Sequence, residues 1–401
     1  MSETPKISRV GLVGVALGLG GLLLADFVVL RPNRLAPGEA VSVFQAIEAW
    51  RWFMLVAGFL LLGLCCLRVD SVRKSVAVQV ATMLGVALPP VLCLGLMAGL
   101  GYAATSNLDA ANPFLRVSVG SAFWLAVLGL FVAFTDFYQR LARNAHLWAL
   151  LVRLGLLVGF LGGVALILQY GGLGNLSLAK EYAGRSHRFF VEMRAHLAIT
   201  GLAVGSAAVI GLPLGVLMHR WRRIRNTSLS VLNIVQTIPS LALFGLLIAP
   251  LAWLSAQAPG LREFGVRGIG WLPAVIALGL YALLPIVRNT YAGFERLETA
   301  VVEAGRGMGM DRMQLFFKVE LPVASPIILN GLRIAGVQIM GNTAVAALIG
   351  AGGFGVFIFQ GLGQSAIDLI MLGAVPTIVL AVALDLVFQV LTRAVTPRGL
   401  E

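Results

Sequence analysis

The sequence EAGRGMGMDRMQLFFKVELP occupies residues 303–322 and separates two long apolar runs, at 271–291 and 323–349. Each run is long enough to cross a bilayer, which takes about 20 mainly apolar residues. The stretch between them is polar and rich in glycine, but its turn and cap residues stand at the positions that helix ends require. The pattern therefore predicts ordered structure between two membrane spans rather than a flexible spacer.

The segment from residue 295 to 322, which we call the elbow, has the pattern of two short helices. Residues from Tyr291 to Gly305 fit one helix with glutamates on its polar positions, and the glycines as far as Gly309 break it. Asp311 is followed three residues later by a glutamine, a capping-box arrangement that starts a second helix. We therefore predict a rigid helical elbow.

An apolar stripe on the second helix of the elbow leaves two roles open. Met313, Phe316 and Phe317 would lie on one face, as in helices that dock in the groove of a partner. The same stripe would also suit a helix pair that lies on the membrane surface. The elbow then ends at Leu321-Pro322, and proline suits the first turn of the following span.

The composition is that of a membrane protein. The chain has 401 residues, of which 59% are hydrophobic and 12% charged, whereas about 25% of a soluble protein is charged. This excludes a soluble globule, a disordered chain and a disulfide scaffold. The three cysteines lie inside apolar runs, and the four histidines lack the spacing of metal ligands, so we expect no metal site.

We predict an all-α polytopic membrane protein with about ten transmembrane helices. The candidate spans are 9–30, 52–67, 76–104, 117–136, 154–172, 195–218, 228–251, 271–291, 323–349 and 366–391. Lysine and arginine concentrate in the loops that share a side with the N-terminus, which predicts that both termini are cytoplasmic. The net charge of +12 is thus a sign of topology and not of nucleic-acid binding.

We expect three parts along the chain. Residues 1–172 would form an N-terminal extension of about five spans, and residues 173–194 an amphipathic segment at the outer membrane surface. Residues 195–395 would form a core of five spans that contains the elbow at about 295–322.

The elbow resembles the EAA loop of ABC importer permeases. Glu303-Ala-Gly305, three residues, Gly309, nine residues and Val319-x-Leu-Pro322 follow the family pattern Glu-Ala-Ala, Gly, Ile-x-Leu-Pro, with Gly305 and Val319 as the two departures. In that family the loop sits in a groove of the ATPase subunit. The resemblance implies an ATPase-coupling role for Glu303, Ala304, Gly305, Gly309, Asp311, Phe316, Leu321 and Pro322.

The spans around the elbow resemble the permeases of glycine betaine, choline and proline-betaine importers. The matching stretches are Gln236–Gly245, Leu280–Gly293 and Ile349–Gly355 followed by Asp368. The resemblance covers about residues 195–395, and the extension resembles a longer-chain subgroup of these permeases. It implies the membrane subunit of an ATP-driven, binding-protein-dependent importer of osmoprotectants in the bacterial cytoplasmic (inner) membrane.

The resemblance also implies the partners. They are two ABC ATPase subunits, a substrate-binding protein on the outside, and a second permease that is either an identical or a related chain. Membrane lipid surrounds the complex. The chain itself would carry no catalytic residues and bind no cofactor, because ATP and Mg²⁺ belong to the ATPase.

Polar residues in the core spans are candidates for the translocation pathway, because such residues are costly inside a membrane. They are Gln236, Pro239, Asn289, Gln338, Asn342 and Asp385. Each has a plainer interpretation. An amide can bond a neighbouring helix, a proline can simply be tolerated, and Asp385 can pair with an arginine.

Three rival functions remain open from the sequence. The chain could be an ABC permease for another small solute such as an amino acid, in which case only the pathway contacts would differ. It could be a secondary carrier driven by an ion gradient, although such carriers favour carboxylates at mid-membrane and Asp385 is the main one in a core span. It could also be a structural membrane protein.

Overall fold

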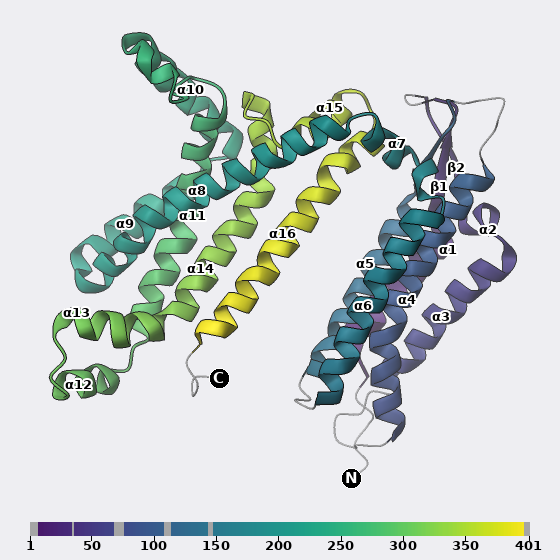
Figure 1. Cartoon of the computed structure of the whole chain (residues 1–401), viewed down its shortest axis with the longest axis horizontal. Helices are drawn as coiled ribbons and strands as arrows, with labels where there is room; N and C mark the ends of the chain where they lie inside the picture. Colours follow the sequence, from purple (N-terminus) through teal and green to yellow (C-terminus); the bar gives the residue numbers. More distant parts are fainter. Residues whose placement is uncertain (1–6, 34–35, 68–75, 108–113, 143–146, 397–401) are drawn as a thin grey trace. The chain divides into compact units, whose positions relative to one another are not determined.

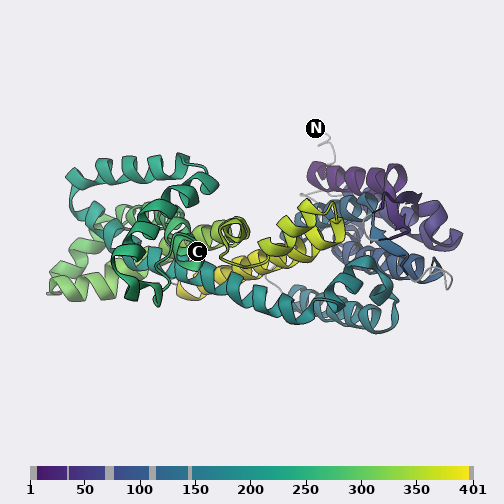
Figure 2. The ribbon, with the colours of Figure 1, turned by 90° about the horizontal axis from the view of Figure 1, so that it is seen from above.

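The computed structural model describes residues 7–33, 36–67, 76–107, 114–142 and 147–396 (Figure 1). The chain divides into two compact units, Met1–Gly184 (unit 1) and Arg185–Glu401 (unit 2). Each unit is a continuous part of the chain, as the order of colours in Figure 2 shows. In the described part, eight helices are long and apolar enough to cross a membrane, and two further apolar helices are shorter. The predicted all-helical membrane architecture is confirmed.

Unit 1 is a bundle of long apolar helices. They are α1 (Arg9–Leu24), α3 (Ala49–Leu67), α4 (Val76–Ser106), α5 (Ser121–Ala142) and α6 (Leu147–Tyr170). Glycines bring α1 and α5 close together, since a Cβ on Gly14 would lie only 2.6 Å from the carbonyl oxygen of Gly129. The short α2 (Val43–Ala46), η1 (Leu173–Asn175) and α7 (Ser177–Ala183) complete the unit.

Unit 1 also contains a small sheet that the sequence analysis did not predict. Its strands β1 (Asp26–Arg31), β2 (Glu39–Ser42) and β3 (Arg116–Val119) run in the order β2-β1-β3, and both pairs are antiparallel. The predicted spans 9–30 and 117–136 are therefore wrong at one end each: α1 stops at Leu24, and α5 starts at Ser121. Short apolar runs with β-branched residues fit a buried strand as well as a helix.

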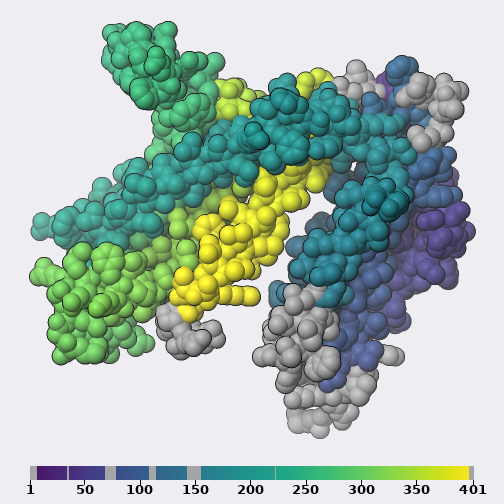
Figure 3. Space-filling model, viewed as in Figure 1, coloured from purple at the N-terminus to yellow at the C-terminus, as the bar shows by residue number. Residues whose placement is uncertain are grey.

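Unit 2 is organised around one central helix. Its long helices are α8 (Ser186–Arg220), α9 (Arg222–Thr237), α10 (Ser240–Gln257), α11 (Trp271–Glu295), α14 (Leu321–Asn342) and α16 (Ile367–Val395). Helix α11 packs against α8, α14, α9 and α10. In its most apolar window 61% of α11 is buried, against 17% of α10. Figure 3 shows α10 as a lobe that stands off the rest of the unit.

The shorter elements of unit 2 lie between these helices. They are η2 (Pro259–Arg262), α12 (Thr299–Gly307), α13 (Arg312–Leu315), η3 (Phe316–Glu320), η4 (Thr343–Ile349) and α15 (Gly355–Gly363). Helices α12 and α13 lie together at one end of the unit, and α10 projects at the other end (Figure 1). The elbow is therefore a separate feature at one end of the bundle.

Two predicted helices are broken in the structure. The predicted span 228–251 is split into α9 and α10, because Pro239 lacks an N–H and holds Ile238 in an extended conformation. The predicted helix from Tyr291 to Gly305 is likewise two helices, with α11 ending at Glu295 and α12 beginning at Thr299.

The boundary between the units also differs from the predicted segment 173–194. Residues up to Gly184, including α7, belong to unit 1. Residues from Ser186 onward are the first turns of the 35-residue helix α8 and do not form a separate surface helix. Apolar and polar residues alternate with helical spacing across this junction, so the periodicity alone did not mark where α8 begins.

Candidate functional site

The two helices of the elbow are joined by a tight glycine turn. Gly309 has a φ of 78°, a conformation that residues other than glycine adopt at a cost. Its N–H donates to the carbonyl of Arg306 at 2.9 Å, and the N–H of Met310 donates to the carbonyl of Gly305 at 3.2 Å. These two bonds form a Schellman motif that satisfies the last carbonyls of α12.

The second helix of the elbow begins with the predicted capping box. The Oδ1 atom of Asp311 accepts hydrogen bonds from the N–H groups of Met313 and Gln314, both at 2.8 Å. The N–H of Asp311 donates in return to the side-chain oxygen of Gln314 at 3.2 Å. A cap of this kind stabilises a helix start by about 1 kcal/mol. Pro322 lies in the first turn of α14, as the sequence predicted.

The inner side of the elbow is fastened to the membrane helices. The ring of Phe316 stacks on Phe294 of α11 with centroids 5.7 Å apart and planes 5° apart. Arg220, the last residue of α8, lies over Phe316 at 5.8 Å and within 3.3 Å of Glu320. Movement of the elbow would therefore reach α8 and α11 directly.

The exposed residues of the elbow include large apolar side chains and an acidic one. Met308 is 70% exposed, Met313 65% and Phe317 56%, and Glu303 is also exposed. Large apolar side chains gathered on a polar element are typical of a docking surface. Met308 was not among the sequence-predicted contact residues, because it stands between two glycines in the segment that was read as a helix break.

The predicted coupling residues divide between these two sides. Glu303, Ala304, Gly309 and Asp311 are exposed, whereas Gly305 is buried and Phe316, Leu321 and Pro322 are partly buried. Gly305 is small for a local reason, since a Cβ there would lie 2.6 Å from the Cδ1 atom of Leu315. The sequence pattern thus combined contact residues with residues that hold the elbow in shape.

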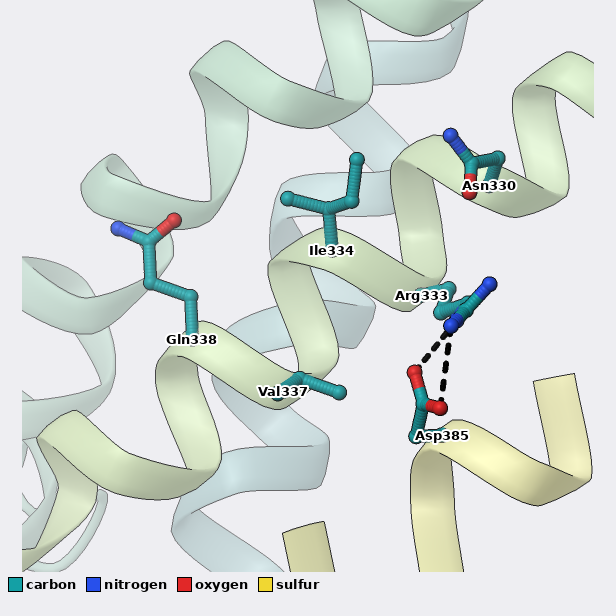
Figure 4. Close-up of a pocket in the computed structure, with 6 residues that line it drawn as sticks. All are labelled: Asn330, Arg333, Ile334, Val337, Gln338 and Asp385. Carbon is teal, nitrogen blue, oxygen red and sulfur yellow. Dashed lines mark hydrogen bonds and ion pairs between the residues drawn. The ribbon is translucent and has the colours of Figure 1, made fainter. Parts of the chain in front are cut away.

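A second polar site lies within the spans of unit 2. Arg333, in the middle of α14, pairs with Asp385 of α16, with Nε–Oδ1 at 2.5 Å and a second bond at 3.0 Å (Figure 4). Gln389 also donates to Asp385 at 2.6 Å. The pairing of Asp385 with an arginine, one of the two interpretations of this residue, is confirmed.

The ion pair borders an open cavity of about 410 Å³. The other lining residues are Asn330, Ile334, Val337 and Gln338, all on α14 (Figure 4). The side chains of Arg333 and Asp385 are 33% and 29% exposed. An ion pair that is about one-third exposed at mid-span is costly in contact with lipid, so this face suits water or another protein.

The remaining predicted pathway residues lie elsewhere and make local bonds. Gln236 donates to the carbonyl of Tyr281 at 2.7 Å and ties α9 to α11, and Asn289 donates to the carbonyl of Pro285 at 2.8 Å within α11. Pro239 stands at the start of α10, and Asn342 ends α14. Besides Asp385, the sequence suggested five pathway residues. Of these five, Gln338 lines the same cavity as Asp385.

A buried polar network, which the sequence analysis missed, joins α8 to the segment before α15. Glu192 accepts from the N–H of Gly353 at 2.8 Å, and His196 accepts from the N–H of Phe354 at 3.2 Å. Thr200 and Thr343 share a hydrogen bond of 2.9 Å. The spacing of Glu192, His196 and Thr200 by one helical turn was the available signal. Within the described residues, no group of three or more acidic, histidine or cysteine side chains is placed to hold a metal ion.

Two family models match the chain. Residues 207–399 match the binding-protein-dependent transport system inner membrane component. Residues 8–179 match the N-terminal domain of the ABC transporter permease YehY. The first match covers the elbow and the Arg333–Asp385 pair, and the second covers nearly all of unit 1.

Curated relatives match about half of the chain. The osmoprotectant import permease protein OsmW of Salmonella typhimurium is 43% identical over 206 residues, which are 51% of this chain and 91% of that protein. The glycine betaine/carnitine/choline transport system permease protein OpuCD of Bacillus subtilis is 39% identical over 221 residues, 55% of this chain and 90% of that protein.

A solved structure of the MetNI methionine ABC transporter, in an inward-facing conformation, matches about half of the chain. The identity is 27%, the TM-score is 0.45, and the match covers 52% of this chain and 96% of the MetNI chain.

Proposed function

Because the chain belongs to the family of binding-protein-dependent ABC importer permeases, with osmoprotectant permeases among its relatives, we propose that it imports glycine betaine-like solutes. The chain is a multi-pass subunit of the bacterial inner membrane, and both of its termini are cytoplasmic in this proposal. Solute would arrive on an external binding protein. A separate pair of ATPase subunits would bind ATP and Mg²⁺ and supply the energy.

The single structural observation that carries the ATP-driven part of this proposal is the construction of the elbow. Its outer side presents Glu303, Met308 and Phe317 to a partner, and its inner side is stacked on α11 and paired with α8. When two ATPase subunits close on ATP, the elbow would shift as a rigid body and carry α8 and α11 with it. The permease thereby contributes a coupling free energy between the nucleotide state and the open side of the pathway.

The cavity beside Arg333 and Asp385 supports a pathway along α14. A glycine betaine-like solute carries a carboxylate and a quaternary ammonium, so a surface with both signs of charge complements it. A second permease, either an identical or a related chain, would cover this face and exclude lipid from the ion pair. Asn330 and Gln338 would line the same route.

The test is uptake of labelled glycine betaine, carnitine and choline by cells that lack other carriers for them. The chain would be expressed with its ATPase and binding protein, either as wild type or as Glu303→Lys. The matched control is Glu263→Lys, the same charge reversal at an exposed residue after η2. We expect uptake in wild type and control, and loss of uptake in Glu303→Lys although the protein still inserts.

Other outcomes of the same assay would reject parts of the proposal. Uptake of none of the three solutes by an intact complex would reject the solute class and favour another small solute such as an amino acid. Uptake that persists after ATP depletion, with the ion gradient maintained, would favour a secondary carrier. Normal uptake by Glu303→Lys would reject the contact assigned to the elbow.

A further inference from the structure

Two arginines stand directly opposite each other on the sheet of unit 1. In the register of β1 and β3, Arg31 pairs with Arg116, and the four residue pairs of this ladder end there. Directly opposed side chains on one face of a sheet have Cβ atoms about 5 Å apart, and like charges at such positions are destabilising. The protein therefore starts two arginine side chains from directly opposed positions on one face of the sheet, at a cost.

A lysine from a neighbouring helix adds a third positive charge. Lys180 of α7 donates to the carbonyl of Leu115, the residue before β3, at 3.4 Å. Burial, followed by the repulsion of Arg116, lowers the pKa of Lys180. The charge of Arg116 therefore acts on Lys180, and three cations share one end of unit 1.

The two arginines also have buried nitrogen atoms without partners. Within the described part of the chain, the Nε of Arg31 and one terminal nitrogen of Arg116 are shielded from solvent and make no hydrogen bond. A buried donor of a charged group that is left unsatisfied destabilises the fold, because it has lost its bonds to water. An anion with several acceptor oxygens that binds between the two arginines would neutralise their repulsion. It would also accept hydrogen bonds from the unpartnered nitrogens.

The position of these cations identifies the kind of anion. The sheet lies where α1 ends and α5 begins, so it is at the membrane-surface end of the bundle. Near it, Arg51 stacks on Trp50 and Tyr102, each at 4.6 Å, and such aromatic side chains mark the level of the lipid headgroups. In the proposed orientation this is the outer surface, where arginine is otherwise disfavoured.

We propose that Arg31, Arg116 and Lys180 bind one phosphate group at the outer end of unit 1. Arginine binds phosphate through two parallel N–H bonds, and three cations match a phosphate better than a single carboxylate. The phosphate is that of an anionic lipid headgroup or free inorganic phosphate, and the test distinguishes the two. This role is independent of the transported solute.

The test uses the assembled transporter in nanodiscs of phosphatidylcholine, with or without phosphatidylglycerol. The variant is Arg31→Gln/Arg116→Gln, and the control Arg262→Gln/Arg267→Gln removes two exposed charges from unit 2. We expect phosphatidylglycerol to raise the unfolding temperature of wild type and control by about 2–4 °C. The variant should show no rise, and mass spectrometry of released complexes should find one phosphatidylglycerol fewer for each copy of the variant chain.

Two further stability measurements distinguish phosphate binding from a merely structural role of the arginines. In pure phosphatidylcholine the variant should be at least as stable as wild type, because it removes the repulsion between two unneutralised arginines. Lys180→Gln should keep the fold and weaken the phosphatidylglycerol effect. These two measurements keep the proposal testable if the double variant folds poorly.

Three results would decide the source of the phosphate or overturn the proposal. An equal stabilisation by inorganic phosphate in phosphatidylcholine discs would assign the site to free phosphate. Equal shifts in wild type and variant for both probes would overturn it. Loss of binding-protein docking in the variant, without any lipid or phosphate effect, would overturn it in favour of an acidic protein partner.

Discussion

Units 1 and 2 are both membrane bundles, but they place their charged groups differently. In unit 1 the pair of Asp136 and Arg140 lies near the start of α1, where Ser8 also donates to Asp136. In unit 2 the pair of Arg333 and Asp385 is set in the middle of α14, beside an open cavity. A charge at the end of a span reaches water, whereas a charge at mid-span needs a partner or a wet surface. If the proposed pathway runs along α14, the pair in unit 2 lies beside it, whereas the pair in unit 1 lies at the end of a span.

The largest effect should come from the turn of the elbow. Gly309→Trp puts a bulky side chain at a φ of 78° on the exposed side, so we expect uptake to fall to background while the protein still inserts. Gly309→Asn is the matched control, because asparagine tolerates this conformation, and it should retain most uptake. Equal uptake by the two variants would show that the turn is not at the ATPase contact.

The two ion pairs should differ in their contribution to stability. Asp385→Leu leaves Arg333 uncompensated at mid-span, and we expect a loss of about 3–5 kcal/mol in the free energy of unfolding. Asp136→Leu should cost only about 1–2 kcal/mol, because Arg140 can turn to solvent. Thermal unfolding in detergent measures both. The exchange Arg333→Asp/Asp385→Arg should recover most of the loss, and equal losses for the two single variants would contradict the contrast between the units.

Variants of the two neighbouring phenylalanines of the elbow should affect two different steps: coupling of the elbow to the membrane helices, and binding of the ATPase. Phe316→Ala removes the stack on Phe294 and should reduce the coupling by about 1–2 kcal/mol, which is about 5–30-fold in solute imported per ATP hydrolysed. ATP hydrolysis itself should continue, because the ATPase still docks. Phe317→Ala, at a residue 56% exposed, should instead weaken ATPase binding. The ratio of uptake to hydrolysis, measured in proteoliposomes, checks this, and identical behaviour of both variants would refute the division of the elbow into two sides.

The smallest effect should come from glycine-to-alanine substitutions, and it should differ between the units. At Gly305 the new Cβ meets the flexible end of Leu315, and alanine gains helix propensity, so we expect a change within about 0.5 kcal/mol. At Gly14 it meets the backbone carbonyl of Gly129, and the cost should be about 1–3 kcal/mol. Unfolding temperatures measure both changes. An equal cost at the two positions would mean that α1 and α5 can separate as easily as Leu315 can rotate.

Features that depend only on residues close together in the chain could be predicted from the sequence. The capping box of Asp311 and the proline start of α14 depend on neighbours within three residues, and both are as predicted. The break at Pro239 had a visible cause, but an apolar run on both sides favoured one continuous span. The strand Asp26–Arg31 could not be found locally, because its partners come from residues 39–42 and 116–119.

The candidate site shows the same division. The motif located the elbow, yet which side chains are exposed depends on packing against α8 and α11. Phe316 stacks on Phe294 of α11, whereas Met308, which the sequence did not single out, is exposed. Among the pathway residues, only the tertiary contact of α14 with α16 distinguishes Asp385, which pairs with Arg333, from Gln236 and Asn289, which bond backbone carbonyls. Sequence spacing alone does not contain that contact.

Photocrosslinking tests most directly the claim that the elbow is the ATPase contact. A photoreactive phenylalanine analogue would replace Glu303 or, as a control, Glu263 in the complete transporter. We expect a crosslink from position 303 to the ATPase subunit and none from position 263. A crosslink from position 263, or none from position 303 although the ATPase co-purifies, would contradict it.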